Sequence, residues 1–340
     1  MSSSLVIQTS FLGDTVLTTP LLAQLANRGA VDVVTTPAAA ALLANHPAVR
    51  TLIAYDKRGE DRGLLGLWRL SRRLRALGYD VAFLAQGSWR SAALALLAGI
   101  PSRIGFSTSA GRLLYTKRVT YRDDLHHAAR LLMLARPNGR EPTPGELRPS
   151  LAPGGAERET VDAFLRAHGV RDGERLIALA PGSVWATKRW PYYPQLAEAL
   201  ADAARIVVVG SSADSELAKA IVAAAPGALD ATGRLSLLAS AELIGRSHVI
   251  VTNDSAPMHL ASAMGTPTVA IFGPTVPDFG FGPLAPRASV VGRDTLPCRP
   301  CDRHGPQRCP LGHHRCMREL TPTAVAERAR ALLLNPDVLA

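Results

Sequence analysis

The sequence predicts an α/β protein made of two similar domains. Short apolar strands alternate with helical segments along most of the chain, which is typical of a parallel sheet covered by helices. The alternation stops once, in a stretch rich in proline and glycine at residues 137–155, and then resumes. With 340 residues, of which 47% are hydrophobic, the chain is long enough to bury two cores.

In the first half, each expected strand is a short apolar run followed by a helical segment. The strands are expected at 5–9, 31–35, 49–54, 79–85 and 103–106. The helices are expected at 15–27, 37–45, 64–77, 89–98 and 123–135. Gly13 allows a tight turn after the first strand, and Asp14 falls at or beside the N-cap of the first helix.

The second half repeats this pattern after a helix expected at 157–168. Its strands are expected at 176–180, 205–210, 248–252 and 267–272, and its helices at 192–203, 213–225, from 235 onward, and 257–264. Regular patterning fades after 283, and an amphipathic helix is expected at 321–334. We therefore predict an amino-terminal domain at 1–165, a carboxyl-terminal domain at 166–320, and a final segment at 321–340 that packs back on the amino-terminal domain.

The stretch at 251–275 reads as strand, loop, helix, strand and loop. Asp254 or Ser255 can cap its helix, and Gly265 ends it. A helix that begins directly after a strand offers a site for an anion, because free N–H groups and the positive end of the helix dipole meet there. Asp254 and His259 are expected at the mouth of such a site. An ordinary βαβ unit, in which Asp254 is only a cap, would show the same pattern.

The loop at 181–191 also follows an expected strand. Gly182 allows close backbone approach, Ser183 supplies a hydroxyl donor, and Lys188 and Arg189 supply two adjacent cations. Such a loop suits a diphosphate. A surface loop with two solvated cations is the plainer alternative.

The net charge of +10 is concentrated in the first half. Residues 1–170 contain 21 lysines and arginines against 13 acidic residues. This excess indicates an anionic partner, such as a nucleic acid, a membrane face or a phosphorylated substrate, unless it reflects codon bias alone. The absence of GxGxxG after the first strand, of GxxxxGK[ST] and of GxSxG argues against a dinucleotide oxidoreductase, a P-loop NTPase and an α/β-hydrolase. We see no signal peptide or membrane-spanning run, so a cytoplasmic location is expected.

The cysteines lie together in one segment. They are Cys298, Cys301, Cys309 and Cys316. Clustering of this kind in a cytosolic protein favours metal binding over disulfides, but the spacing is not that of a paired CxxC motif. A structural zinc, reduced thiols and a disulfide all stay open, and no metal ligand is assigned.

Four motifs, taken in order, resemble those of the ADP-heptose:lipopolysaccharide heptosyltransferases of glycosyltransferase family 9, and most closely the type II members. They are Gly13–Pro20; Pro181–Ser183 with Lys188–Pro191; Thr252–Ser255 with Met258 and His259; and Phe272–Thr275. The cysteine segment extends the resemblance to about Leu320. The chain departs from the family at Ala256 and Pro257, where many members have a glycine, and this leaves the exact donor open.

The resemblance implies a GT-B architecture, with two Rossmann-like domains facing across a cleft. It implies that the first domain binds the acceptor and the second the nucleotide sugar. The implied reaction is inverting transfer of heptose from ADP-L-glycero-D-manno-heptose to the lipopolysaccharide inner core, heptosyl-Kdo-lipid A, with no metal required. Asp14 matches the family's general base, with Gly13 and Thr15 beside it on the acceptor side. The implied enzyme is a monomer at the cytoplasmic face of the inner membrane and does not bind nucleic acid.

For the donor, the resemblance implies that Lys188, Ser183 and the helix N-terminus after Asp254 meet the charge that develops on ADP. Asp254 is expected to hold heptose hydroxyls, and His259 to support the phosphate or the loop. The expected donor-binding set also includes Gly182, Gly210 and Ser255.

Two alternatives stay open beside this interpretation. One is a related family-9 glycosyltransferase with another sugar or acceptor. The other is a basic nucleic-acid-binding protein with a zinc knuckle. The second predicts aromatic residues interleaved with arginines on one face, whereas aromatic residues make up only 5% of the chain and Trp185 and Trp190 lie in the diphosphate loop.

Overall fold

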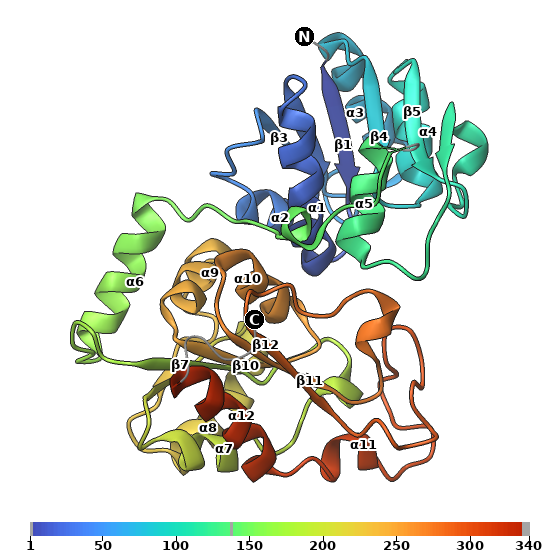
Figure 1. Ribbon diagram of the computed structural model, residues 1–340. Coiled ribbons are helices and arrows are strands. Elements are labelled where there is room, and N and C mark those ends of the chain that lie inside the picture. Colours follow the sequence, from blue (N-terminus) through green and yellow to red (C-terminus); the bar gives the residue numbers. More distant parts are fainter. Residues whose placement is uncertain (1–2, 137–138, 335–340) are drawn as a thin grey trace. The chain divides into compact units, whose positions relative to one another are not determined.

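A computed structural model describes residues 3–136 and 139–334 (Figure 1). Its contacts divide the chain into two units, residues 1–152 and 153–340. The boundary falls before the predicted one at 165, because helix α6 (Gly155–Ala167) belongs to the second unit. It packs against α9 (Leu237–Arg246), and Arg246 forms an ion pair with Asp162 of α6.

The described residues of the first unit form a six-stranded parallel sheet in the order β3-β2-β1-β4-β5-β6. The strands are β1 Ser4–Gln8, β2 Val31–Thr35, β3 Thr51–Ala54, β4 Val81–Leu84, β5 Ser102–Phe106 and β6 Lys117–Val119. The helices are α1 Leu12–Ala26, α2 Pro37–Leu42, α3 Gly63–Leu77, α4 Trp89–Leu97 and α5 His127–Ala135, with short 3-10 turns at Arg112–Leu114 and Pro144–Leu147. Every residue of the central strands β1 and β2 is buried, as expected when helices cover both faces of a parallel sheet.

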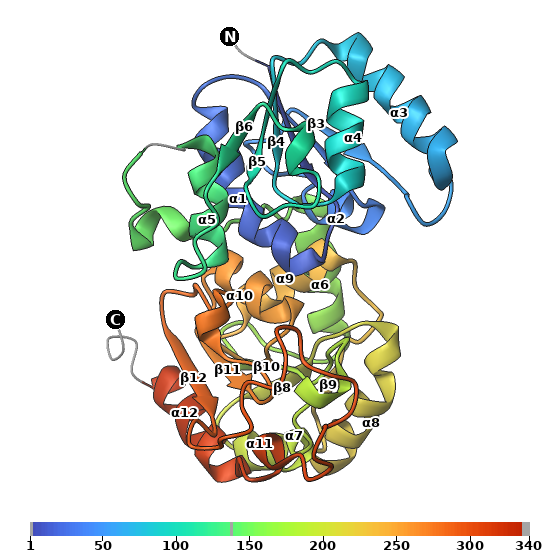
Figure 2. The same cartoon turned by 90° about the vertical axis from the view of Figure 1, so that its right-hand side faces the viewer.

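The second unit repeats this order as β12-β11-β10-β7-β8-β9. The strands are β7 Leu176–Ala180, β8 Arg205–Val208, β9 Leu229–Asp230, β10 Val249–Asn253, β11 Thr268–Phe272 and β12 Ala288–Gly292. Besides α6 and α9, the helices are α7 Tyr193–Leu200, α8 Ser215–Ala224, α10 Ala256–Met264, α11 Arg315–Arg318 and α12 Pro322–Leu334, with 3-10 turns at Ala186–Lys188, Ser212–Asp214 and Pro277–Phe279. Figure 2 shows α7 and α8 beside the strands of this unit.

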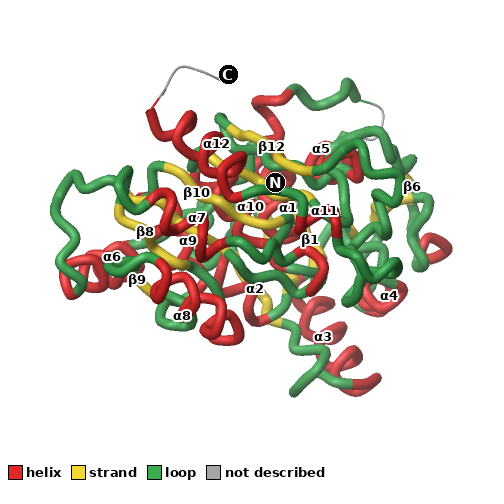
Figure 3. Tube along the Cα trace, turned by 90° about the horizontal axis from the view of Figure 1, so that it is seen from below, coloured by secondary structure: helices red, strands yellow, loops and turns green. Residues whose placement is uncertain are grey.

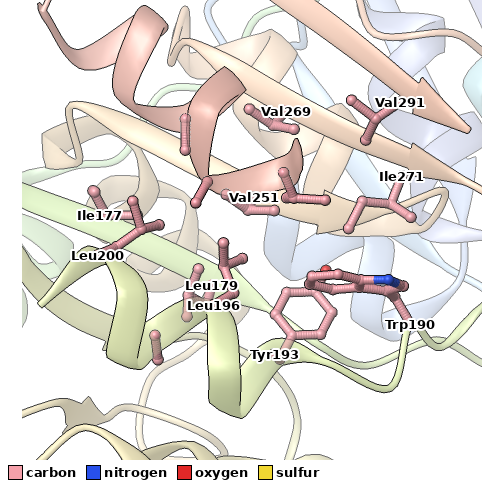
Figure 4. Close-up of a cluster of buried hydrophobic side chains, with 14 of the residues drawn as sticks. Ile177, Leu179, Trp190, Tyr193, Leu196, Leu200, Val251, Val269, Ile271 and Val291 are labelled. Carbon is pink, nitrogen blue, oxygen red and sulfur yellow. The ribbon is translucent and has the colours of Figure 1, made fainter. Parts of the chain in front are cut away.

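The core of the second unit lies between the sheet and a layer that includes α7 and α12. Figure 4 shows β-branched and leucine side chains of β7, β10 and β11 meeting Leu196 and Leu200 of α7, with Trp190 and Tyr193 at one end. Helix α12 adds Val325 to this core and packs against α7, β10 and β11 (Figure 3). The described part of the final segment, which we expected on the amino-terminal domain, thus belongs to the core of the second unit. Residues 335–340 lie outside the described residues.

The strands that sequence patterning missed lie at the sheet edges. These are β6, β9 and β12. Each is short or partly exposed, so none of them shows the continuous apolar run that marks the central strands. Within the described ranges 3–136 and 139–334, every helix is too short or too polar to cross a bilayer.

Both sheets reverse their strand order at an equivalent point. In the first unit this point lies between β1 and β4, and in the second between β7 and β10. Open α/β sheets bind ligands at the carboxyl ends of the strands at such a reversal point. The loops that follow these four strands are therefore the places to look for a site.

Candidate active site

Asp14 lies at the reversal point of the first sheet. It is the third residue of α1, whose N-cap is Phe11, so the expectation that Asp14 caps the helix is wrong. Its carboxylate accepts a hydrogen bond from Ser10 Oγ (2.7 Å), and its side chain is 20% exposed. A carboxylate in the first turn interacts favourably with the positive end of the helix dipole. The helix thus presents a reachable carboxylate beside the end of β1.

A histidine whose side chain is 12% exposed lies beside this carboxylate. Nε2 of His127, the first residue of α5, is 3.9 Å from Asp14 Oδ1. Burial, with smaller effects from Arg130 and His126, lowers the pKa of His127 to about 3. The imidazole is therefore neutral near pH 7, and it gives Asp14 a polar neighbour without a full positive charge.

The two chain neighbours of Asp14, which we expected to bind the acceptor, support the helix itself. Gly13 is a buried residue of α1, so the tight turn expected there is not formed. Thr15 is 1% exposed, and its hydroxyl donates to the carbonyl of Phe11 (3.3 Å). Both residues support the turn that carries Asp14.

The Thr-Thr-Pro part of the first motif also stabilises α1. Pro20 lacks an N–H, so the carbonyl of Val16 loses its usual helical donor. Thr19 Oγ1 donates to that carbonyl instead (2.8 Å), and Ser150 N donates to the same hydroxyl (2.9 Å). A proline inside the helix is therefore accommodated without leaving a buried acceptor unpaired.

Two residues that the sequence analysis did not select hold the loop after β1. Lys57 Nζ donates to Thr9 O (2.7 Å), and Thr9 Oγ1 donates to Gln86 Oε1 (2.5 Å). Burial, followed by the charges of Arg58 and Arg90, lowers the pKa of Lys57. Lys57 and Gln86 lie 48 and 77 residues beyond Thr9, so only the sheet topology brings them together.

In the second unit, Lys188 and Asp254 form an ion pair at the reversal point. Lys188 Nζ lies 2.6 Å from Asp254 Oδ2, and the two side chains are only 9% and 10% exposed. Thr275 Oγ1 donates to the same oxygen (2.7 Å). Together with Thr275, the ion pair joins the loops after β7, β10 and β11. The sequence analysis treated Lys188 as a loop cation and Asp254 as a candidate cap, and it missed that they are partners.

Asn253 fixes the loop at 181–191, which we call the diphosphate loop after its expected ligand, against β10. Its side chain is fully buried, and Nδ2 donates to Pro181 O (2.8 Å). Its Oδ1 accepts from Trp190 N and from the hydroxyl of Tyr193 (both 3.3 Å). Arg189, in contrast, is exposed and donates to the loop's own backbone. Asn253 thus sets the position of the segment that carries Lys188.

Gly182 and Gly210 make room for a neighbouring turn. A Cβ built at Gly182 would lie 2.3 Å from Asp214 Oδ1, and one at Gly210 would lie 2.9 Å from Asp214 Oδ2. Asp214 in turn accepts from the backbone N–H (2.9 Å) and hydroxyl (2.8 Å) of Ser211. These glycines therefore bring the loops after β7 and β8 close together.

The remaining residues that we expected to bind the nucleotide sugar have hydrogen-bond partners close in sequence or lie inside a helix. Ser183 Oγ accepts from Trp185 N (3.3 Å). Ser255 is the N-cap residue of α10 but makes no side-chain cap bond, and its hydroxyl faces Asn253 O (3.4 Å). His259 is 5% exposed within α10, so it is buried to about the same degree as Lys188 and Asp254.

The segment after β12, which showed no regular patterning, clamps the diphosphate loop. Gln307 accepts from Ala186 N and donates to Val184 O (both 3.1 Å), and His314 Nε2 lies 2.8 Å from Thr187 O. Thr187 also donates its hydroxyl to Pro306 O. The loop that carries Lys188 is thus held from outside as well as by Asn253.

The four cysteines of this segment are free thiols. Burial, with a smaller effect from the neighbouring thiols, raises the pKa of Cys316 to about 11. Cys309 Sγ accepts from His314 N (3.4 Å), so one thiol contacts the clamp directly. Across the described residues, no three histidine, cysteine or acidic side chains gather in a way that could hold a metal ion.

Comparison with solved structures identifies the class of protein. The structure described as "E. coli ADP-heptose lps heptosyltransferase II" matches with a TM-score of 0.80 and 29% identity, covering 99% of this chain and all of the other. The chain is therefore an α/β glycosyltransferase of the GT-B class, and the predicted fold class is confirmed.

The particular family follows from the sequence comparisons. The profile of "Glycosyltransferase family 9 (heptosyltransferase)" matches residues 67–309, and the chain belongs to this family. Lipopolysaccharide heptosyltransferase 2 of Escherichia coli K12 is 30% identical over 357 residues, covering 98% of this chain and 99% of the relative. Lipopolysaccharide heptosyltransferase 1 of Pseudomonas aeruginosa is 29% identical with the same coverage. The predicted family and enzyme class are confirmed.

Proposed function

We propose that this glycosyltransferase moves heptose from ADP-L-glycero-D-manno-heptose to the inner core of lipopolysaccharide, with heptosyl-Kdo-lipid A as acceptor and inversion at the anomeric carbon. The names of the full-length relatives support the sugar and the acceptor. The description of the matching solved structure supports ADP-heptose as donor. The enzyme would work as a monomer at the cytoplasmic face of the inner membrane.

In this proposal Asp14 is the general base. Inversion by a single displacement needs one group that takes the proton of the attacking hydroxyl. Asp14 is partly exposed at the reversal point of the first sheet, and Ser10 and the first turn of α1 hold its carboxylate in place. Gly13 and Thr15 act by supporting this turn.

Lys188 is proposed to meet the negative charge that develops on the leaving ADP. A lysine ammonium has three N–H donors, and the contact with Asp254 uses one of them. Asp254 therefore orients Lys188 and leaves donors for a diphosphate. Among the described residues, both hydrogen bonds to this carboxylate end on Oδ2, which leaves Oδ1 for a sugar hydroxyl.

Backbone groups complete the proposed donor site. The N–H groups at the start of α10, after Ser255, and the backbone at Gly182 and Ser183 are suited to phosphate oxygens. Gly210, at the end of β8, borders the proposed adenosine site. His259 supports this site by packing within α10.

One observation carries the proposal. The Lys188–Asp254–Thr275 contact joins three of the four motifs shared with the family at the reversal point of the second sheet. The remaining motif, Gly13–Pro20, contains Asp14, which lies at the equivalent point of the first sheet. No single loop contains these residues, so their arrangement depends on the topology of the two sheets.

The test is ADP release by the purified protein given ADP-heptose and truncated lipopolysaccharide acceptors. We expect release only with both substrates, and mass spectrometry should show the acceptor heavier by one heptose. Release with another ADP-sugar, but not with ADP-heptose, would instead favour a related family-9 enzyme. ADP-heptose at about 100 times its Kd should stabilise the protein by about 2.7 kcal/mol, and an oligonucleotide should not.

A further inference from the structure

Helix α3 of the first unit exposes large apolar side chains to solvent. Leu64 is 82% exposed, Leu65 64% and Trp68 50%. They lie in the first two turns of the helix, so they form one group and are not scattered residues. Single exposed leucines are ordinary on a protein surface, but neighbouring ones with a tryptophan mark an interaction surface.

The spacing places these residues on one stripe. Leu64 and Trp68 are four residues apart, and Leu65 and Trp68 are three apart, so each pair shares a face of the helix. The buried side of α3 is formed by other positions, which include Leu67, Leu70 and Leu74. The exposed stripe is therefore not needed to pack α3 onto its sheet.

The same helix is strongly basic. From Gly63 to Leu77 it contains four arginines and no acidic residue. The arginines are Arg69, Arg72, Arg73 and Arg75, all exposed. The guanidinium carbon of Arg72 lies 5.0 Å from the centre of the Trp68 ring, so charge and apolar surface are in direct contact.

Helix α4 continues this surface. Arg90 of α4 donates to the carbonyl of Gly63 (2.5 Å), which ties the first turns of the two helices together. Trp89, the first residue of α4, is 62% exposed. Figures 2 and 3 show α3 at the edge of its unit, and Figure 2 shows α4 beside it. We call Leu64, Leu65, Trp68 and Trp89, with the arginines of α3, the α3 surface.

We propose that the α3 surface docks on an anionic lipid bilayer. Leucine and tryptophan enter the boundary between head groups and acyl chains, and the arginines meet lipid phosphates. An arginine-rich helix with a leucine and tryptophan stripe has the composition of helices that lie flat on a membrane. The inference rests on the proposed function for its setting and names the surface that makes the membrane contact.

Charge favours a bilayer over a second copy of this chain. A symmetric dimer built on the α3 surface would place arginine-rich helices against each other, with like charges facing. An anionic bilayer supplies the opposite charge over the whole surface. A lipid surface therefore satisfies both the apolar and the basic part of the patch.

Vesicle sedimentation of the full-length protein, without substrates, tests the proposal. We expect binding to vesicles of phosphatidylcholine with about one-third phosphatidylglycerol, and little binding to phosphatidylcholine alone. The variant Leu64→Ser/Leu65→Ser/Trp68→Ser should bind at least about 10-fold more weakly. The matched control Val290→Ser/Leu311→Ser/Leu334→Ser removes three exposed apolar residues of the second unit and should bind like the original protein.

Charge and insertion are tested separately. Arg69→Glu/Arg72→Glu/Arg73→Glu should lose binding, and Arg166→Glu/Arg171→Glu/Arg175→Glu, which reverses three exposed arginines of the second unit, should keep it. Brominated lipids should quench the tryptophan fluorescence of the original protein but not that of Trp68→Phe/Trp89→Phe. Unchanged melting temperatures would show that every variant is folded, because all substituted side chains are exposed.

Equal vesicle binding by the α3 variants and their controls would overturn the proposal. So would a protein that stays off anionic vesicles but is a dimer by light scattering and becomes a monomer in the triple serine variant. ADP release with a water-soluble acceptor should be the same in the α3 variants. Loss of ADP release in the original protein with intact vesicle binding would refute the proposed function and leave this inference standing.

Discussion

The two units share one strand order but surround their carboxylates differently. Asp14 in the first unit is partly exposed, accepts a hydrogen bond from the Ser10 hydroxyl and has a neutral histidine as neighbour. Asp254 in the second unit is buried and neutralised by Lys188 at 2.6 Å. A partly exposed carboxylate is reachable by a substrate hydroxyl, whereas a buried carboxylate in an ion pair positions its cation. The same topology thus gives the two carboxylates different surroundings, and this difference underlies the different roles that we propose for them.

Replacing the carboxylate of the first unit is expected to have the largest effect. Asp14→Asn keeps the shape but removes the base, so kcat should fall by about 1,000-fold. ADP affinity should change by less than about 2-fold, because the proposed donor groups lie in the second unit. Steady-state kinetics and calorimetry measure the two quantities. Asp124→Asn is the matched control, and near-normal turnover of Asp14→Asn would remove Asp14 as the base.

Breaking the ion pair of the second unit should cost stability as well as activity. Lys188→Met leaves the buried Asp254 carboxylate without its cation, and we expect a loss of about 3–5 kcal/mol in the free energy of unfolding. Urea unfolding measures it, and Asp254→Asn in the same chain should recover part of the loss. Lys219→Met, which breaks an exposed pair with Glu216, should leave the free energy unchanged. Equal effects of the two lysine substitutions would contradict the comparison.

The neutral histidine beside Asp14 should make stability depend on pH. Its pKa is lowered from 6.5 to about 3 on folding, so the unfolded chain binds an extra proton between these values. Stability should therefore fall as pH decreases below 6.5, by about 2 kcal/mol between pH 7 and 5 from this group. His127→Gln should flatten this dependence in urea unfolding. An unchanged slope would show that the ring is not buried and neutral.

A third carboxylate, the buried Asp32 of β2, sharpens the contrast. Burial raises its pKa, but hydrogen bonds from Arg50 and Tyr79 outweigh this, and the net shift is downward. Asp32 thus stabilises the fold above its unfolded pKa near 4, and this is lost as pH falls through the lower folded pKa. Asp32→Asn should cost about 1 kcal/mol at pH 7, since Arg50 is half exposed. The difference in the free energy of unfolding between this variant and the original protein should narrow as pH falls below the unfolded pKa; a constant difference would contradict the ion pair.

Sequence patterning predicted most of the elements that carry the site. The strand β7 is a continuous apolar run, and β10 begins with three β-branched apolar residues, so the burial of both strands follows from composition. Helix α10 ends at Gly265 with a left-handed φ of 73°, as the glycine predicts. The predicted boundaries were less accurate. Helix α1 begins at Leu12, three residues before the predicted start at Thr15, and its N-cap, Phe11, makes no side-chain hydrogen bond that a sequence pattern could reveal.

The clamp on the diphosphate loop was not predictable from local sequence. Gln307 and His314 contact backbone atoms more than 120 residues away. A single glutamine or histidine in an unpatterned segment carries no signal of such a partner. The same holds for Lys57, whose contact with Thr9 depends on β3 and β1 being strands of one sheet.

By itself, the sequence determined the α/β class, the two halves and the loops in which Asp14, Lys188 and Asp254 lie. Periodicity, turn residues and motif order are local properties, so a chain displays them before it folds. Only the tertiary structure decided that Lys188 and Asp254 are partners, that His259 is buried and that α12 belongs to the second core. These are contacts between distant segments, and their energies depend on burial, which no single segment specifies.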